Sequence, residues 1–245
     1  MIKLELPPKP AELTEELQER LTQEFKNTEK SVWNIDWLKK AVLAKSYGKC
    51  CYSEIRLDEE SKYMEIEHFH PKKPYSDEVM LWENLLPSCK TCNGSKLNHD
   101  TKKEPIINPF IDNPKEYLCF KDYRYHPLNN NQLGRITIDV LNLNHRKQFF
   151  IPRCKLGYEI CEKLEEMYDN IENMLNPKKQ KRYIKQIKGL LNEGNREEEY
   201  SALVSTIILS DTNFQSIENQ LKENKLWDKE FEALRQELEY CALMK

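Results

Sequence analysis

The sequence predicts an α+β fold, in which a mostly helical chain is interrupted by one segment of short strands and loops. Apolar residues recur at steps of three and four at both ends of the chain, as they do along amphipathic helices. That spacing is lost between Cys50 and about His145, where most of the cysteines, prolines and histidines lie. Two runs in this segment, Tyr63–Phe69 and Arg135–Val140, have the composition of short strands.

Helices are expected on both sides of that segment. The first is expected over about residues 11–26, with Leu13, Leu17, Leu21 and Phe25 on one stripe. A second is expected over about residues 31–47, where Trp33, Trp37, Ala41 and Ala44 recur. It should end before Gly48, a typical helix terminator. Residues 108–131 combine Asn, Pro, Asp and aromatic residues, which predicts an ordered loop with short strands. Helical spacing returns from Pro152 to the end of the chain.

Length and composition favour a cytoplasmic protein. The 245 residues can bury a core without a disulfide framework. The first eight residues lack the apolar core of a signal peptide, and no apolar run approaches the ~18 residues of a membrane span. We therefore expect no membrane partner and eight reduced cysteines, whose paired spacings indicate metal rather than disulfides.

The net charge of −3 is unusual for a protein that binds nucleic acid alone, since Lys and Arg usually neutralise the phosphates. Either the basic residues gather on one face, or a partner supplies part of the positive surface. The strongest basic run is Lys178-Lys179-Gln180-Lys181-Arg182-Tyr183, extended by Lys185 and Lys188. It is typical of a solvated helix face, and the alternative is a surface for nucleic acid or an acidic partner.

A carboxylate and a histidine, Glu67 and His68, end the first expected strand, and Pro71 favours a turn soon after them. Adjacent strand residues face opposite sides, so the pair can serve one site only if the strand ends there. A carboxylate and an Asn amide oxygen suit Mg²⁺, and a neutral histidine near that ion can take a proton from water. Together these groups form a minimal set for phosphodiester hydrolysis.

Three motifs follow one another in a fixed order: Glu67-His68, then Trp82-x-Asn84-Leu85, then Cys89-x-x-Cys92-Asn93-x-x-Lys96. This order resembles the HNH endonuclease family, whose β-hairpin and helix wrap one catalytic metal ion in a ββα-metal fold. The resemblance implies that His68 is the general base and that Glu67 and Asn93 bind Mg²⁺ or Mn²⁺. It further implies that Asn84 fixes the loop and orients the histidine, that Lys96 faces phosphate, and that His70 and Lys72 are weaker candidates for phosphate contact.

The resemblance departs from its pattern at Ser53, where members with a structural zinc usually carry a cysteine paired with Cys50. A serine hydroxyl is a poor zinc ligand beside thiolates. Three alternatives stay open. Zinc is held by Cys50, Cys89, Cys92 and one other group; Cys51 takes part through a shifted loop; or no zinc binds and the cysteines form a small apolar core. Cys119, Cys154, Cys161 and Cys241 show no paired spacing and are expected in the core.

Downstream, Ile107-Asn108-Pro109-Phe110 and the run of residues 135–144 are similar to the PtuB family of Septu defence nucleases, including its retron-associated form. That family implies an anti-phage effector working with the ATPase PtuA, and in retron systems with a reverse transcriptase and its multicopy single-stranded DNA. The resemblance to HNH endonucleases favours DNA as the nucleic acid substrate. The alternatives are a tRNA-cleaving or other RNA-cleaving effector, and an inactive zinc-stabilised binding module. We divide the chain into an N-terminal arm with two helices (1–48), a nuclease domain (49–150) and a C-terminal helical region (151–245).

Overall fold

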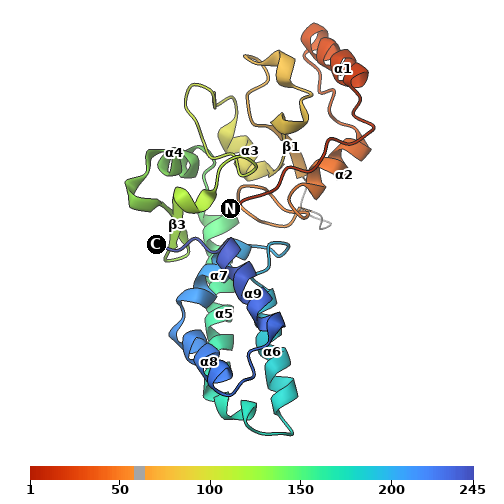
Figure 1. The fold of residues 1–245 in the computed structure, drawn as a ribbon. Coiled ribbons are helices and arrows are strands. Elements are labelled where there is room, and N and C mark those ends of the chain that lie inside the picture. Colours follow the sequence, from red (N-terminus) through yellow and green to blue (C-terminus); the bar gives the residue numbers. More distant parts are fainter. Residues whose placement is uncertain (58–63) are drawn as a thin grey trace.

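A computed structural model describes residues 1–57 and 64–245 (Figure 1). Helices dominate this part of the chain, and β-strands form two antiparallel pairs within it, so the predicted α+β class is confirmed. The helices are α1 (Glu15–Thr28), α2 (Asp36–Ala44), α3 (Lys90–Lys96), α4 (Gln132–Val140), α5 (Ile151–Asp169), α6 (Gln180–Asn192), α7 (Ser201–Ser210), α8 (Thr212–Glu223) and α9 (Lys229–Cys241). The strands are β1 (Met64–His68), β2 (Leu85–Cys89), β3 (Leu118–Lys121) and β4 (Arg124–Pro127). Short helical turns are η1 (Ser76–Glu78), η2 (Trp82–Asn84), η3 (Pro114–Glu116), η4 (Leu128–Asn130), η5 (Arg146–Phe150) and η6 (Ile171–Met174).

Strands β1 and β2 form an antiparallel hairpin, and α3 follows β2 without an intervening loop. Glu67 pairs with Leu86 and His68 with Leu85 in this register. The strand predicted over Tyr63–Phe69 is confirmed for Met64–His68, whereas Tyr63 lies outside the described residues. The hairpin and α3 thus bring the expected site residues into one local unit.

The two faces of β1 have different neighbours, because side chains alternate along a strand. Ile66 packs with Leu85 in a core cluster that also holds residues of α1 and α2. Glu65 and Glu67 instead contact residues of α3. The N-terminal helices therefore cover one side of the hairpin, and α3 covers the other.

The N-terminal helices are both shorter than the ranges 11–26 and 31–47 suggested. Helix α1 begins after Thr14, whose hydroxyl accepts a hydrogen bond from the Leu17 amide at 3.2 Å. It ends at Thr28, because the next residue, Glu29, is left-handed with φ of 55°. Helix α2 starts only at Asp36, because Ile35 is extended.

The strand predicted over Arg135–Val140 is wrong, since these residues lie in α4. The side chain of Asn131 caps this helix by accepting a hydrogen bond from the Gly134 amide at 3.0 Å. Thr137, Ile138 and Leu141 are buried, a helical spacing that the β-branched composition concealed. Tertiary packing here outweighs the preference of Ile, Thr and Val for strands.

Helices α5–α9 form the lower part of the molecule in Figure 1 and share a core cluster of their own. The helical stripes expected after Pro152 are thereby confirmed. A second cluster joins Leu86 and Phe149 to Ala202 and Leu243, so buried contacts cross residue 150. The division at 48 and 150 stays a prediction. Among the described helices, none has the length and apolarity needed to cross a membrane.

The turn that carries Cys50 is anchored to the C-terminal helices by buried polar contacts. Lys49 Nζ donates hydrogen bonds to the carbonyls of Arg196 and Glu198, both at 2.7 Å. Glu54 Oε1 accepts one from the Ser201 hydroxyl at 2.6 Å. These contacts hold the turn against the start of α7, so the C-terminal helices support one wall of the cysteine cluster.

Candidate active site

His68 ends β1 and is only 3% exposed. Its Nε2 lies 3.0 Å from the Val79 carbonyl oxygen, and because a carbonyl only accepts, Nε2 must carry the proton. The other ring nitrogen, Nδ1, is a buried acceptor with no hydrogen-bond partner among the described residues. Burial, and secondarily the charge of Lys72, lowers the pKa of His68 to about 3. The ring is therefore neutral at physiological pH, with a free lone pair on Nδ1.

The His68 ring is covered by Trp33, whose ring centroid lies 4.3 Å away in an edge-on arrangement. The ammonium of Lys72 lies 5.1 Å from the centroid of the same indole. Because Nδ1 is buried, the side chains packed around the ring must move before substrate reaches it.

Glu67 is 2% exposed and points to the face of β1 opposite to His68. His68 is the last residue of β1, so the two side chains can serve one site only at this end of the strand. Glu67 Oε1 lies 2.6 Å from Lys96 Nζ, but the orientation leaves this oxygen without a hydrogen bond among the described residues. Burial raises the pKa of Glu67 to about 7, against the opposing effect of Lys96. A buried, incompletely bonded carboxylate oxygen is a fitting ligand for a hard divalent cation.

Lys96 lies one helical turn after Asn93 and is 2% exposed. Besides the ion pair with Glu67, its ammonium donates to the His68 carbonyl at 2.9 Å. The side chain thus lies inside the protein and balances the buried carboxylate. Its predicted contact with phosphate stays a prediction, and this arrangement offers no exposed ammonium for it.

Asn93, on α3, is half-buried, and its Nδ2 donates to Glu65 Oε2 at 2.7 Å. This bond fixes which end of the amide is the donor, so Oδ1 is the end that can bind a cation. Asn93 therefore contacts Glu65, and Lys96 contacts Glu67. Asn93 and Lys96 are one turn apart on α3, and Glu65 and Glu67 share one face of β1.

Asn84 precedes β2 and is 4% exposed. Its Oδ1 accepts a hydrogen bond from the His70 amide at 2.7 Å, and its Nδ2 donates to the carbonyls of His70 at 3.3 Å and Glu78 at 3.0 Å. Glu78 directly precedes Val79, whose carbonyl binds His68. Asn84 is thus one step removed from the histidine and holds the loop that orients it.

His70 and Lys72 lie on the loop after β1 and are both half-buried. The Thr101 hydroxyl donates to the Phe69 carbonyl at 2.8 Å, so His70 Nδ1, 2.7 Å from that hydroxyl, is the donor to it. Burial lowers the pKa of His70, and its Nε2 is then an acceptor rather than a donor toward phosphate. The ammonium of Lys72 is the better suited of the two for phosphate contact, because it only donates.

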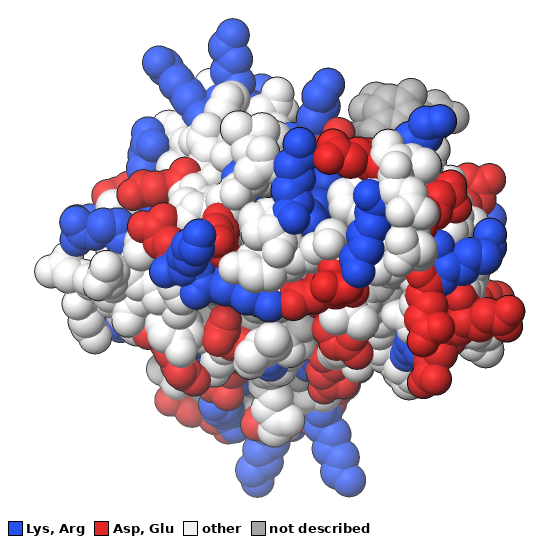
Figure 2. Space-filling model, turned by 90° about the horizontal axis from the view of Figure 1, so that it is seen from above, with Lys and Arg blue, Asp and Glu red and all other residues white. Residues whose placement is uncertain are grey.

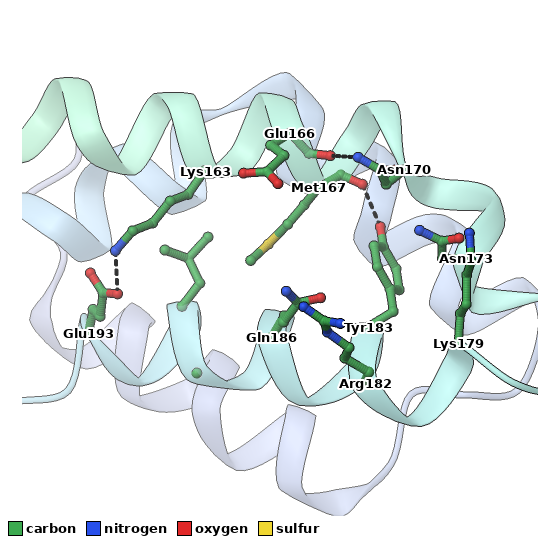
Figure 3. Close-up of a pocket in the computed structure, with 12 residues that line it drawn as sticks. Lys163, Glu166, Met167, Asn170, Asn173, Lys179, Arg182, Tyr183, Gln186 and Glu193 are labelled. Atoms are coloured by element: carbon green, nitrogen blue, oxygen red, sulfur yellow. Dashed lines mark hydrogen bonds and ion pairs between the residues drawn. The ribbon is translucent and has the colours of Figure 1, made fainter.

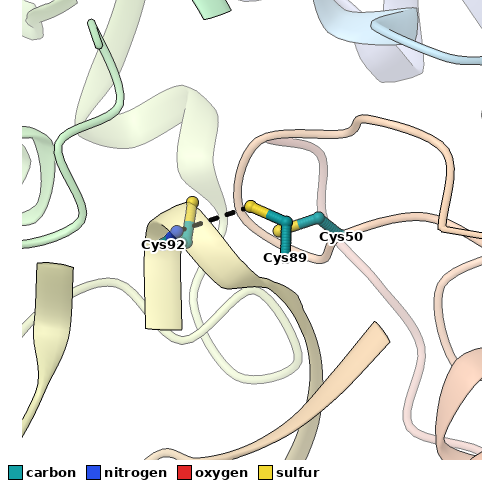
Figure 4. Close-up of side chains that lie close together, drawn as sticks. All are labelled: Cys50, Cys89 and Cys92. Carbon is teal, nitrogen blue, oxygen red and sulfur yellow. Dashed lines mark hydrogen bonds between the residues drawn. The ribbon is translucent and has the colours of Figure 1, made fainter. Parts of the chain in front are cut away.

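Three buried cysteines, Cys50, Cys89 and Cys92, bring their sulfur atoms within 4.8 Å of one another (Figure 4). The amide of Ser53 donates to Cys50 Sγ at 3.5 Å, and that of Cys92 to Cys89 Sγ at 3.4 Å. Two thiolates around a tetrahedral zinc lie roughly 3.8 Å apart, given a Zn–S bond of about 2.3 Å. The cluster can therefore bind a metal such as zinc after a small contraction.

Two buried serine hydroxyls lie beside this cluster: Ser53 Oγ is 3.7 Å from Cys89 Sγ, and Ser88 Oγ is 3.9 Å from Cys50 Sγ. Cys51 is not part of the cluster among the described residues. Of the remaining cysteines, Cys119 and Cys241 are buried as expected, whereas Cys154 and Cys161 are only half-buried.

Basic and acidic side chains are intermingled over the end of the molecule that carries α1, with no single sign covering that face (Figure 2). This face therefore gives no sign of the basic concentration that would offset the net charge of −3.

Sequence reasoning missed four residues that shape the site: Glu65, Val79, Thr101 and Trp33. Only Glu65 had an available signal, because it lies two residues before Glu67 and so shares its strand face. Val79 acts through its backbone carbonyl, which no side-chain pattern reveals. Thr101 and Trp33 reach the site from distant parts of the chain.

No family model matches the chain. It is 41% identical over 239 residues to Septu protein PtuB of Bacillus thuringiensis, a match that covers 96% of this chain and 92% of that relative. Septu protein PtuB of Bacillus mycoides (strain KBAB4) is 32% identical over 158 residues, which are 52% of this chain and 53% of that relative. The first similarity extends over both the candidate site and the C-terminal helices.

Proposed function

The chain belongs to the Septu PtuB family, and from this premise we propose that it is a metal-dependent nuclease of the HNH type. In this proposal it hydrolyses phosphodiester bonds, in DNA first of all, as the effector of an anti-phage defence complex. The observation that carries the proposal is the neutral His68 with a free Nδ1, directly after a buried carboxylate.

His68 is the general base. Because Val79 holds the proton on Nε2, Nδ1 is available to take a proton from water as that water attacks phosphorus. A pKa of about 3 keeps the base neutral, at some cost in basicity, and the tautomer needs no rearrangement before each turnover.

Glu67 Oε1 and Asn93 Oδ1 would hold Mg²⁺ or Mn²⁺. Such an ion supplies charge stabilisation at the scissile phosphate and at the leaving oxygen. Glu65 is a positioning residue in this scheme, because its carboxylate orients the amide of Asn93. The positive charge of Lys96 balances the negative charge of the Glu67 carboxylate. Lys72 contacts substrate phosphate once its ammonium has moved away from the Trp33 ring.

Zinc would be held by Cys50, Cys89 and Cys92, with the Ser53 hydroxyl or a water molecule as the fourth ligand. It would join the turn after α2 to the start of α3, and so support the helix that carries Asn93. Its role is structural, because none of the three sulfur atoms belongs to a residue of the base or the catalytic ion.

His68→Ala tests the proposal directly. We expect it to lose cleavage of supercoiled plasmid in Mg²⁺ or Mn²⁺, while keeping the wild-type circular dichroism spectrum. His126→Ala, on β4, is the matched control and should cleave normally. Wild-type rates for His68→Ala would remove the base assignment.

The Glu65 role is tested by a conservative pair. Glu65→Gln keeps an acceptor for Asn93 Nδ2 and should retain Mn²⁺ binding by calorimetry, whereas Glu65→Ala should weaken it. Equal weakening by both variants would instead indicate that the Glu65 charge itself is required.

The partner is proposed to be the ATPase PtuA, with a reverse transcriptase and its multicopy single-stranded DNA as further components in a retron-type system. Co-expression with PtuA, followed by cleavage of DNA, tRNA and other RNA, separates the alternatives. Cleavage of RNA alone would favour the RNA-directed effector. Absence of any cleavage in the assembled complex would favour an inactive binding module.

A further inference from the structure

A groove lies between α5 and α6 on the C-terminal helices, with a cavity volume of about 650 Å³ (Figure 3). Met167 is half-buried and supplies apolar surface to it, Tyr183 and Leu190 lie beneath as buried lining, and the amide side chains of Asn170 and Gln186 line its walls. We call this the α5–α6 groove. It involves none of the residues of the candidate active site.

The charges in the groove are only partly compensated. Lys163 and Glu193 form an ion pair across it at 2.7 Å. Lys179 and Arg182 on the α6 side, and Glu166 on the α5 side, have no ion-pair partner within residues 1–57 and 64–245. The uncompensated charge is therefore positive, and it is concentrated on the α6 wall.

The α6 wall also contains a glycine that the fold itself does not require. Gly189 lies inside the helix, is exposed, and a Cβ atom built on it would meet nothing within 4 Å. A glycine inside a helix costs about 1 kcal/mol relative to alanine. Its presence leaves the helix backbone open to close approach by an occupant of the groove.

The chemistry of the groove favours a peptide over nucleic acid. The Tyr183 hydroxyl donates to the Met167 carbonyl at 2.7 Å, and the ring is 3% exposed, so it offers no face for stacking a base. A peptide can use the apolar surface for a side chain, the amide groups for its main chain, and Glu166 for its N–H groups.

We propose that the α5–α6 groove binds an acidic peptide segment of a protein partner. The carboxylates of that segment lie against Lys179 and Arg182, and an apolar side chain covers Met167. The main chain passes close to Gly189. This interaction is independent of the nuclease chemistry, so the inference does not rest on the proposed function.

The test measures fluorescence anisotropy of labelled probes on the full chain. The probes are a synthetic amphipathic peptide of Glu and Leu, the same peptide with Lys in place of Glu, a Glu peptide without Leu, and duplex DNA. We expect saturable binding of the Glu–Leu peptide, with weaker binding of the other three. His68→Ala should bind the Glu–Leu peptide like the wild type.

Paired charge reversals locate the contact. Lys179→Glu with Arg182→Glu should weaken binding about tenfold, since two partly exposed charge contacts are lost. Lys181→Glu with Lys185→Glu is the matched control, because it changes the net charge equally on exposed positions of the same helix outside the groove. Glu166→Gln should strengthen binding, and Gly189→Trp should block it.

Three results would overturn the proposal: no saturable binding of the Glu–Leu peptide, equal binding of duplex DNA, or equal weakening by the groove pair and the control pair. Circular dichroism of each variant confirms that the helices remain folded, so a loss of binding reports on the groove itself.

Discussion

Replacing Asn84 by alanine tests how the site is held together. The substitution removes one acceptor and one donor group that together make three hydrogen bonds to the backbone of the loop after β1. At about 1 kcal/mol for each bond, the free energy of unfolding should fall by about 3 kcal/mol. That is a large part of the ~5–15 kcal/mol typical of folded proteins.

Asn84→Ala should also lower the cleavage rate, because Asn84 holds the Glu78 carbonyl beside Val79. Without this restraint the Val79 carbonyl no longer selects the His68 tautomer with a free Nδ1. The expected loss is on the order of tenfold to a hundredfold, as for a small misplacement of a reacting group. Asn84→Asp should be no better, since it sets a carboxylate oxygen against two carbonyls.

Asn144 provides the matched control. It makes the same kind of contact elsewhere, accepting from the Tyr125 amide and donating to the Tyr125 carbonyl, both at 2.9 Å. Asn144→Ala should cost about 2 kcal/mol for its two bonds and leave cleavage unchanged at temperatures where it is folded. Urea unfolding gives the stabilities, and plasmid cleavage gives the rates. A folded Asn84→Ala that cleaves like Asn144→Ala would refute the reasoning.

Three further predictions concern other parts of the chain. Ser53→Cys should complete a four-thiolate site and slow zinc release to a chelator, and an unchanged release rate would place the fourth ligand elsewhere. Burial lowers the pKa of Lys45 to about 7. Between pH 7 and pH 10.5 this group is therefore protonated in the unfolded chain and neutral in the folded one. The free energy of unfolding should rise over that range by about 1.4 kcal/mol per pH unit from Lys45. Lys45→Met should flatten that rise in urea unfolding at several pH values, and parallel curves would contradict the assignment. Gly189→Ala should raise the free energy of unfolding by about 1 kcal/mol in the same assay, and a loss of stability would show that the glycine is needed by the fold.

Much of the candidate site was accessible from sequence because its residues lie close together in the chain. Glu67 and His68 end one strand, Asn84 precedes the next, and Asn93 follows it on α3. A hairpin followed directly by a helix needs few long-range contacts, so the order of motifs nearly determines which side chains meet. The wrong prediction of a strand over residues 135–140 has the opposite cause. These residues have the composition of a strand, and only the burial of Thr137 and Ile138 in the folded protein favours a helix.

The sequence by itself determined the α+β class and a strand over Met64–His68, and it offered a cluster of Cys50, Cys89 and Cys92 as one of three alternatives. Only the tertiary structure decided the state of each group. Val79 selects the tautomer of His68, Lys96 is buried against Glu67, and Glu65 orients Asn93. The physical reason is that protonation, tautomer and amide orientation depend on burial and on backbone carbonyls, which distant packing places and no local spacing encodes.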